Sequence, residues 1–260
     1  MTPVYAVDIK SNETVVQDRE LIIKDHGAIV RGDTNSKQMA IVFTGDEFAD
    51  GGEHIIRTLS EHDTKASFFL TGNFYANPKF RGLISKMKTA NHYLGAHSDK
   101  HLLYCDWIKR DSLLVTEQTF YKDLMANYKK MASFGITKKA AKFFLPPYEW
   151  YNDSIASWTK KLSLQLINFT SGTRTSADYT TPLMKGYKTS EEIFNSVINY
   201  EASSPSGLNG FIMLIHVGTD PSRKDKFYNY LDKLLEFLKA KGYKPVKIDE
   251  LLSIYQFQFF

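Results

Sequence analysis

Short apolar runs alternate with longer amphipathic segments along most of the chain. Each run is rich in Val, Ile, Leu and Phe, whereas the segments between the runs place apolar residues three and four positions apart. Continuous apolar strands separated by amphipathic helices are typical of a parallel sheet covered by helices. The pattern fits both a closed barrel and an open doubly wound sheet. The predicted strands are residues 39–44, 65–71, 92–96, 142–145, 164–170, 210–216 and 243–248, and the predicted helices are residues 51–63, 77–90, 116–135, 154–162, 190–202 and 224–242.

The first part of the chain has a different pattern, in which apolar and polar residues alternate. Residues 13–25 and 27–33 predict the two strands of a small hairpin. No linker or low-complexity tract interrupts the units that follow. We therefore expect one domain, in which a β extension formed by residues 1–38 packs on a main unit formed by residues 39–260.

The composition is that of an ordinary globular protein and narrows the class of function. Of 260 residues, 43 % are hydrophobic, and 33 Lys and Arg face 29 Asp and Glu for a net charge of +4. This small, scattered excess of positive charge does not indicate a nucleic-acid partner. No apolar run reaches the roughly 18 residues of a membrane span, and the residues after Met1 lack the features of a secretory signal. The single cysteine, Cys105, lies among large apolar residues and predicts a buried, unreactive thiol.

Two pairs of potential metal ligands follow predicted strands directly. His97 and His101 have a spacing that lets two imidazoles share one metal ion. Asp46 and Glu47 are adjacent carboxylates, which are costly to bring near a pocket unless a cation neutralises one and leaves the other free as a base. Each pair also has a plain structural explanation, as surface or capping histidines in the first case and as an acidic helix start in the second.

Two further strand ends carry polar or rigid residues. The run at 210–216 ends in His216, which on its own indicates a satisfied core or loop histidine. The run at 142–145 is followed by Pro146 and Pro147, which fix a turn with aromatic residues beyond it. All four clusters lie at the carboxyl ends of predicted parallel strands, where the sites of such folds gather. Their shared position favours a functional site over four coincidences.

The order and spacing of these motifs resemble the polysaccharide deacetylase family, the NodB homology domain of carbohydrate esterase family 4. The matching segments are Thr-Gly-Asp-Glu-Phe at 44–48, His-Ser-x-x-His at 97–101, Leu-Pro-Pro-Tyr at 145–148, Asp-Tyr at 178–179 and Leu-Ile-His at 214–216. The resemblance covers residues 39–252 and implies an α/β fold, a distorted seven-stranded (β/α) barrel with a small N-terminal β-hairpin layer. The surroundings of the first three motifs are also similar to a divergent Bacteroidetes subgroup of the family.

The resemblance implies one divalent metal ion as a cofactor. Glu47 matches the family's metal-binding Asp, and His97 and His101 match its two histidine ligands. Two imidazoles and one carboxylate suit Zn2+ best, while Ni2+, Co2+ and Fe2+ bind the same ligands. A metal held in this way lowers the pKa of bound water and polarises the carbonyl group of the substrate.

The resemblance also implies roles for three residues in the reaction. Asp46 matches the catalytic base, His216 matches the general acid, and Tyr148 matches the residue whose backbone N–H binds the oxyanion. Pro147 and Trp150, in the same turn as Tyr148, are expected to contact the substrate. Four aromatic residues near strand ends belong either to a sugar groove or to the core: Trp107, Trp150, Tyr151 and Tyr179.

Departures from the family pattern concentrate around the base. Leu145 stands where the family has an arginine that orients the base, and Glu47 is one methylene longer than the family's Asp. Arg174 lies near Asp178, the counterpart of the Asp in the family's Asp-Trp motif. We therefore hypothesise that Arg174 supplies the missing guanidinium by pairing with Asp46 or Asp178.

Together these residues predict a metal-dependent hydrolase that removes acetyl groups from N-acetylated sugars in oligo- or polysaccharides. The alternatives are an O-acetyl esterase with the same catalytic residues and a carbohydrate-binding domain that has lost catalysis. The expected partner is the acetylated saccharide, with no nucleic acid, membrane or obligate protein partner. Polysaccharide substrates place the protein in the periplasm, on the cell surface or outside the cell.

Overall fold

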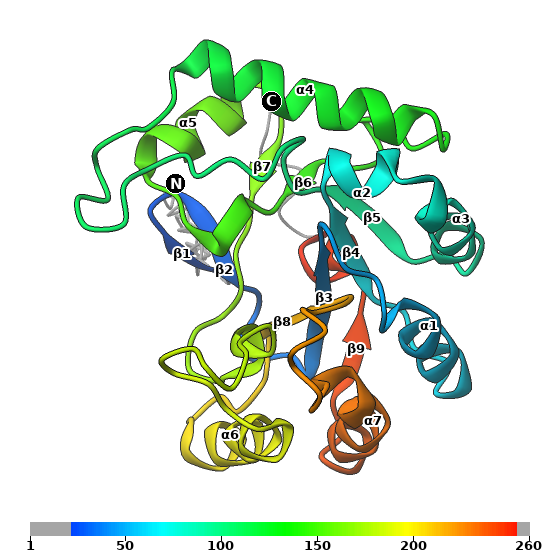
Figure 1. Ribbon diagram of the computed structural model, residues 1–260. Coiled ribbons are helices and arrows are strands. Elements are labelled where there is room, and N and C mark those ends of the chain that lie inside the picture. Colours follow the sequence, from blue (N-terminus) through cyan, green and yellow to red (C-terminus); the bar gives the residue numbers. More distant parts are fainter. Residues whose placement is uncertain (1–21, 254–260) are drawn as a thin grey trace, which may run out of the picture.

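Seven parallel strands form one curled sheet at the centre of the molecule, and the long helices lie around its outside (Figure 1). The computed structural model describes residues 22–253. The strands follow the order β7-β6-β5-β4-β3-β8, and β9 pairs with the first residues of β3. Their bounds are β3 (Gln38–Gly45), β4 (Ser67–Leu70), β5 (Tyr93–Ala96), β6 (Phe143–Phe144), β7 (Gln165–Leu166), β8 (Ile212–His216) and β9 (Lys244–Val246).

Four of the described α-helices (α2, α4, α5 and α6) begin at a short polar side chain that caps them. Thr71, Thr116, Asn152 and Thr189 each accept a hydrogen bond from the backbone N–H three residues further on. The five-residue helix α2 is too short for its periodicity to be recognised in the sequence. The helices are α1 (Gly52–Glu61), α2 (Gly72–Ala76), α3 (Arg81–Thr89), α4 (Glu117–Ala132), α5 (Asp153–Lys161), α6 (Ser190–Ser203), α7 (Leu231–Ala240) and α8 (Ile248–Leu251). Within residues 22–253, none of these helices has the length and apolar character to cross a bilayer.

The helix α7 is shorter than the prediction of residues 224–242. The Nζ of Lys226 donates to the carbonyl oxygens of Thr219 and Asp220, which holds the chain in a loop at this point. A short 3-10 helix over Phe227–Tyr230 follows, and the α-helix begins only at Leu231. Local hydrogen bonds of a loop therefore replace the first turns of the predicted helix.

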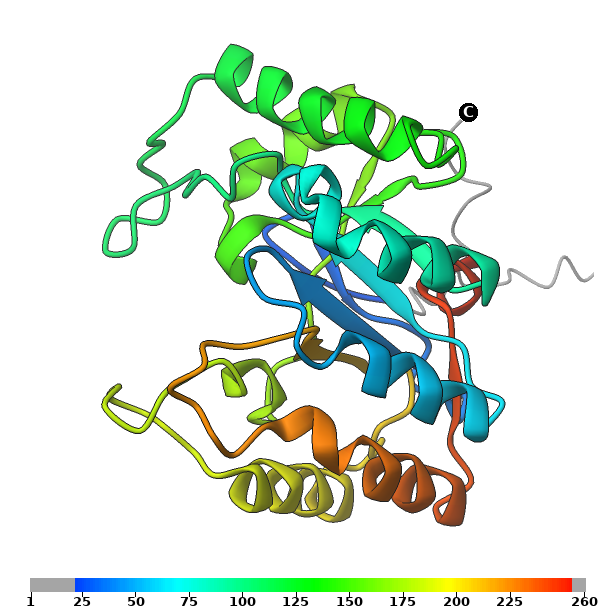
Figure 2. The same ribbon diagram turned by 45° about the vertical axis from the view of Figure 1, so that its right-hand side comes forward.

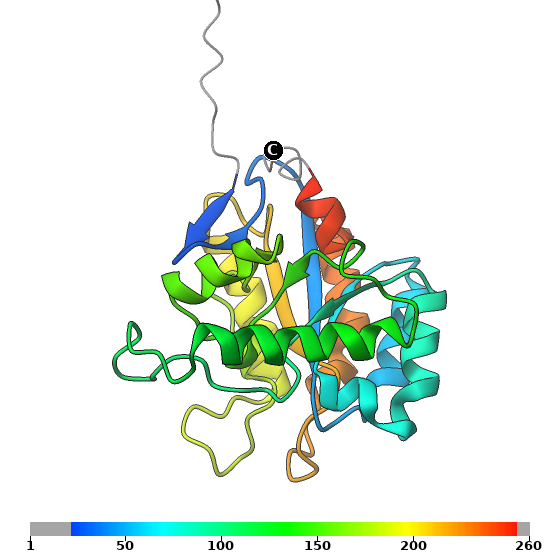
Figure 3. The same ribbon diagram turned by 90° about the horizontal axis from the view of Figure 1, so that it is seen from above.

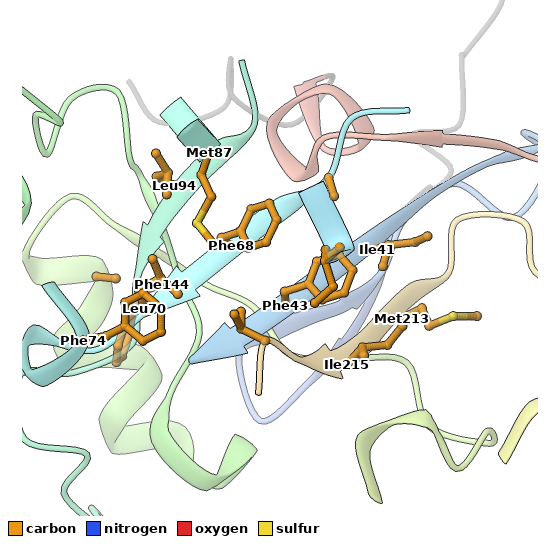
Figure 4. Packing of buried hydrophobic residues seen from close by; sticks show 14 of the residues in the cluster. Ile41, Phe43, Phe68, Leu70, Phe74, Met87, Leu94, Phe144, Met213 and Ile215 are labelled. Atoms are coloured by element: carbon orange, nitrogen blue, oxygen red, sulfur yellow. The ribbon is translucent and has the colours of Figure 1, made fainter. Parts of the chain in front are cut away.

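Side chains along each strand alternate between two buried layers. On β3, Ile41 and Phe43 belong to an outer core between sheet and helices, whereas Ala40 and Val42 belong to an inner core enclosed by the curled sheet. Figure 4 shows the outer core, in which Phe43 stacks on Phe68 with ring centroids 5.1 Å apart. The strands read as continuous apolar runs because both of their faces are buried.

This alternation decides which side chains reach the mouth of the half-barrel, by which we mean the carboxyl ends of β3, β5, β6 and β8. On β8, Leu214 points into the inner core, so His216 two residues later lies on the same side. Tyr93 on β5 also belongs to the inner core, and His97 follows it at an even spacing. Leu145, after β6, is part of the inner core itself. The register of the strands thus gathers residues from different strands at one end of the sheet.

A two-stranded hairpin lies between the two edges of the curled sheet. Its strands are β1 (Ile23–Asp25) and β2 (Ala28–Arg31), and residues 13–21 of the predicted first strand lie outside the described residues. Isolated β-bridges join Ile29 to Ile167, next to β7, and Arg31 to Phe211, next to β8. The hairpin thus fills the opening of the sheet. The expected α/β fold with seven strand units and a hairpin layer is confirmed.

Candidate active site

The mouth of the half-barrel brings together most of the residues predicted to act in the reaction. The rings of His97 and His101 have centroids 5.1 Å apart, and the ring of His101 lies 4.4 Å from that of Tyr148. Asp46 and His216 are close enough for their charges to affect the pKa of His101. Figure 2 shows two loops, residues 102–116 and 178–189, projecting from the molecule on the same side.

His97 has the surroundings of a neutral imidazole with one nitrogen free. Its side chain is buried, and Nδ1–H donates to the carbonyl oxygen of Leu145 at 2.8 Å, which leaves the lone pair of Nε2 available. Burial, together with the neighbouring His101, lowers the pKa of His97 well below its ordinary value. Burial also lowers the pKa of His101, against the opposing effect of Asp46. Two neutral imidazoles, one tied through Nδ1 to a backbone carbonyl, have the donor chemistry that a divalent metal requires.

The segment that carries both histidines has an unusual backbone held by helix α4. Ser98 and His101 have positive φ angles of 74° and 54°, which cost free energy in residues other than glycine. The carboxylate of Asp123 accepts hydrogen bonds from Ser98 Oγ at 2.6 Å and from Lys100 N at 3.0 Å. Asn127 Oδ1 accepts from the backbone N–H of His97 at 3.0 Å. The helix thereby fixes the direction of both imidazoles.

Asp123 and Asn127 were not among the residues predicted from the sequence. A signal for them is present, since both interrupt the apolar face of a helix whose other buried residues are Phe120, Leu124, Tyr128 and Met131. Polar residues four apart on a buried helix face indicate hydrogen-bond partners outside the helix.

The two adjacent carboxylates have different surroundings. Asp46 is half-buried, and its Oδ1 accepts hydrogen bonds from Thr71 Oγ1 at 2.7 Å and from Asn73 Nδ2 at 3.3 Å. Glu47 is exposed and makes no hydrogen bond or ion pair with residues 22–253. In this part of the chain, no three His, Cys, Asp or Glu side chains are arranged to hold a metal ion. The structure brings two of the three predicted ligands together and leaves Glu47 apart from them.

His216 is oriented by a buried carboxylate. Its Nδ1–H donates to Asp178 Oδ1 at 2.6 Å, and its backbone N–H donates to Asp178 Oδ2 at 2.9 Å. Burial acts to lower the pKa of His216, but the charge and hydrogen bond of Asp178 outweigh burial, so the pKa is raised above its ordinary value. With Nδ1 engaged, Nε2 is the nitrogen that remains for proton transfer.

The hypothesised role of Arg174 is wrong in this structure. Its guanidinium donates to the carbonyl oxygen of Gly186 at 3.2 Å and forms no ion pair with Asp46 or Asp178. The side chain thus lies against the 178–189 loop. Leu145, at the position of the family's arginine, is fully buried in the inner core. Neutral donors thus hold Asp46, where the family uses a cation.

The turn after β6 carries two consecutive residues with positive φ, Tyr148 at 57° and Glu149 at 53°. Pro147 is buried at the start of this turn. In the described part of the chain, the N–H of Tyr148 makes no backbone hydrogen bond outside its own short helix. Burial raises the pKa of Glu149 to about 7, with Asp178 adding to the effect and His216 opposing it. Glu149, which the sequence prediction missed, is thus a further titratable group near His216.

A curled parallel sheet with a buried Asp–His pair, two neutral imidazoles and a carboxylate at its mouth defines the class of this protein, a hydrolase on a (β/α) half-barrel. The chain belongs to the polysaccharide deacetylase family, because the sequence model described as polysaccharide deacetylase matches residues 31–167, just over half of the chain. The family and the enzyme class expected from the motifs, a deacetylase-type hydrolase acting on carbon–nitrogen bonds, are confirmed.

Relatives with assigned activities are similar over most of the chain. A peptidoglycan-N-acetylglucosamine deacetylase of Bacillus cereus is 20 % identical over 249 residues, which cover 96 % of this chain and 80 % of the relative. A chitin deacetylase of Colletotrichum lindemuthianum is 24 % identical over 202 residues, which cover 76 % of this chain and 73 % of the relative.

Solved structures share the fold at low sequence identity. A pseudoenzyme of carbohydrate esterase family 4 from Bacillus anthracis has a TM-score of 0.68 at 20 % identity, covering 88 % of this chain and 70 % of its own. The family 4 carbohydrate esterase PdaA of Bacillus subtilis has a TM-score of 0.65 at 21 % identity, covering 89 % of this chain and 87 % of its own. These similarities confirm the architecture.

Proposed function

We propose that this protein is a metal-dependent deacetylase that removes acetyl groups from N-acetylated sugars in oligo- or polysaccharides. The observation that carries the proposal is the position of two neutral imidazoles, His97 and His101, at the same barrel mouth as His216, whose ring is held by Asp178. A lone binding surface has no need of a histidine whose pKa is raised by a buried carboxylate.

His97 and His101 would hold the metal through their free nitrogens, and Glu47 would complete the ligand set. Glu47 has no competing partner among the described residues, so its carboxylate can turn without breaking a contact. Zn2+ suits these ligands best, and Ni2+, Co2+ or Fe2+ would also bind. The bound ion would supply a Lewis acid that acidifies water and polarises the acetyl carbonyl.

Three residues of the chain would then carry out the proton transfers and charge stabilisation. Asp46, oriented by Thr71 and Asn73, accepts a proton from the attacking water. The N–H of Tyr148 donates a hydrogen bond to the oxyanion that forms on the acetyl carbon. His216, whose protonated form is favoured by Asp178, gives its proton to the departing amine.

The relatives named as peptidoglycan-N-acetylglucosamine and chitin deacetylases favour a saccharide that carries N-acetyl groups. Such substrates lie in or beyond the cell envelope, so we place the protein in the periplasm, at the cell surface or outside the cell. An O-acetyl esterase would use the same residues and differ in the leaving group.

A second candidate is a saccharide-binding protein without catalysis. The exposed position of Glu47 and the buried Leu145 favour it, because they alter the ligand set and the support of the base. The similar pseudoenzyme from Bacillus anthracis shows that this fold also occurs without activity.

Metal analysis combined with an acetate-release assay tests the proposal. We expect one divalent metal per chain and acetate release from N-acetylated chitooligosaccharides by the purified protein. His97→Ala should lose both metal and activity, whereas His216→Ala should keep the metal and lose turnover. A protein that binds no metal and releases no acetate from amide or ester substrates would support the binding role instead.

A further inference from the structure

An aromatic row leads from the surface to the histidine pair. Trp150 stacks on Trp107 with centroids 5.6 Å apart and planes inclined by 28°, and Trp107 meets Tyr148 edge-on at 5.6 Å. Tyr148 in turn lies 4.4 Å from the ring of His101. The row therefore joins the 102–116 loop to the turn after β6 and ends at a predicted metal ligand.

The outer members of this row are open to solvent. Trp107 is 54 % exposed and Tyr148 is 44 % exposed. Isolated apolar side chains are common on protein surfaces, but two adjacent large rings beside a catalytic mouth leave an apolar area that a ligand can cover.

Specific hydrogen bonds hold the loop that presents Trp107. Asp106 Oδ1 accepts from the N–H groups of Ile108 and Lys109 at 2.8 and 2.7 Å, which closes the turn around Trp107. The carbonyl oxygen of Asp106 accepts from Trp150 Nε1 at 3.0 Å, so the two indoles are tied together. Figure 3 shows this loop extending beyond the N-terminal end of α4.

Arg110 packs against Trp150, a member of the aromatic row, and against the neighbouring Tyr151. Its guanidinium carbon lies 4.5 Å from the centroid of Trp150, and its Nε donates to the carbonyl oxygen of Tyr151 at 2.6 Å. This cation is thereby engaged with Trp150 and Tyr151, and the Trp107 indole is a neutral ring open to solvent. A rigid, uncharged aromatic face suits the apolar face of a sugar ring and requires little ordering when the sugar binds.

We propose that Trp107 and Tyr148 form a binding subsite for the sugar unit next to the one that is deacetylated. The substrate is then a chain of at least two sugar units, and a single N-acetylated monosaccharide leaves the Trp107 face empty. This inference rests on the proposed function for the position of the reacting sugar, whereas the aromatic subsite itself is independent of catalysis.

Chain-length dependence of catalysis tests the subsite. Trp107→Ala should lower kcat/KM for N,N′,N″,N‴-tetraacetylchitotetraose by roughly ten-fold or more through KM, with activity on N-acetylglucosamine unchanged. Trp107→Phe, which keeps a ring, should recover most of the loss, and Tyr121→Ala, which removes an exposed aromatic residue from α4, should have no effect. Equal activity of Trp107→Ala and the wild type on the tetramer would overturn the proposal.

Binding without turnover separates this inference from the proposed function. Titration of the chelator-treated wild type with tetraacetylchitotetraose should change its tryptophan fluorescence, and Trp107→Ala should abolish most of that change. A protein that releases no acetate but still shows the Trp107-dependent change would disprove the deacetylase and retain the subsite. The absence of any Trp107-dependent change would disprove the subsite whether or not acetate is released.

Discussion

Asp178 binds His216 through both of its carboxylate oxygens, one to the ring Nδ1 at 2.6 Å and the other to the backbone N–H at 2.9 Å. Asp178 is 1 % exposed and follows the short helix Thr175–Ala177, so the pair is a fixed unit. The carboxylate sets the tautomer of the imidazole, its direction and the pKa at which it loses its proton.

Asp178→Asn tests this relationship through the pH dependence of kcat. His216 must be protonated to act as an acid, so kcat falls as the pH rises through its pKa. Removing the charge of Asp178 leaves burial as the main influence and lowers that pKa. We expect the alkaline limb of the kcat profile to move to lower pH and kcat at pH 8 to fall roughly ten-fold or more.

The matched measurements for Asp178→Asn are metal content and KM. Both should stay near the wild-type values, because Asp178 touches neither the histidine pair nor the aromatic row. An unchanged alkaline limb in this variant would mean that another group supplies the proton.

Most of the fold was predictable because both faces of its strands are buried. Runs such as 210–216 are continuous in apolar residues for that reason. Because His216 lies two residues after Leu214, the sequence already predicts that both side chains lie on the same face of the sheet. The start of α7 at Leu231 was not predictable, since it depends on where Lys226 finds its acceptors. The hydrophobic pattern determines where the elements lie, while hydrogen bonds of single side chains, such as the Thr71 cap and the Lys226 contacts, determine where they begin.

The sequence predicted which strand ends carry the site residues, but it did not predict the hydrogen bonds that hold those residues in place. The resemblance singled out Asp178, but nothing in the sequence shows that Asp178 meets His216 whereas Arg174 meets Gly186. Glu47 follows β3 directly, yet in the described residues it does not join the two histidines in a group arranged to hold a metal ion. The supporting contacts from Asp123 come from a helix about 25 residues further along the chain, and the interrupted apolar face of that helix signals a partner without showing which one.

Thr71→Val tests the support of the proposed base. The hydroxyl of Thr71 donates to Asp46 at 2.7 Å and also accepts from Phe74 N at 3.1 Å. Losing a hydrogen bond to a charged group costs about 1.5–3 kcal/mol, so kcat should fall roughly ten- to hundred-fold with metal content unchanged.

Thr71→Ser is the matched control, because it keeps the hydroxyl and with it both the helix cap and the contact to Asp46. It should retain near wild-type kcat. If the serine and valine variants lose activity equally, packing of the threonine methyl group rather than orientation of Asp46 is the cause.

Asp123→Asn tests whether α4 holds the segment between His97 and His101 in a shape that binds metal. The amide has only one acceptor oxygen, so it cannot satisfy the donors of Ser98, Lys100 and the hydroxyl of Tyr104, which lies 2.7 Å from Asp123 Oδ2. We expect zinc affinity, measured by calorimetric titration, to fall about 10- to 100-fold. Lys122→Ala, at an exposed position of the same helix, should bind zinc as the wild type does. Full affinity in Asp123→Asn would show that the backbone of residues 97–101 holds its shape without this carboxylate.

Glu149→Gln tests the half-buried carboxyl group of Glu149 through the stability of the protein. Burial raises the pKa of Glu149 to about 7 from its ordinary value of 4.5, so the folded state binds the proton more tightly than the unfolded state. The folded wild type therefore loses stability as the pH rises from about 4.5 to 7, and the loss persists above pH 7. The amide introduced by Glu149→Gln resembles the neutral carboxyl group, so the variant should be more stable than the wild type at pH 8, by about 1–3 kcal/mol given partial contact with water.

The advantage of Glu149→Gln should vanish near pH 4, where the wild-type carboxyl is neutral in the folded state and largely neutral in the unfolded state. Thermal unfolding at pH 4, 6 and 8 measures this, and a difference of a few degrees is expected at pH 8 for a chain of this length. Glu236→Gln, at an exposed position inside α7 and away from its first turn, should change neither the unfolding temperature nor its pH dependence. A constant difference between wild type and Glu149→Gln at all three pH values would mean that Glu149 keeps an ordinary pKa and that hydrogen bonding in the Pro146–Trp150 turn, not ionisation, distinguishes the two side chains.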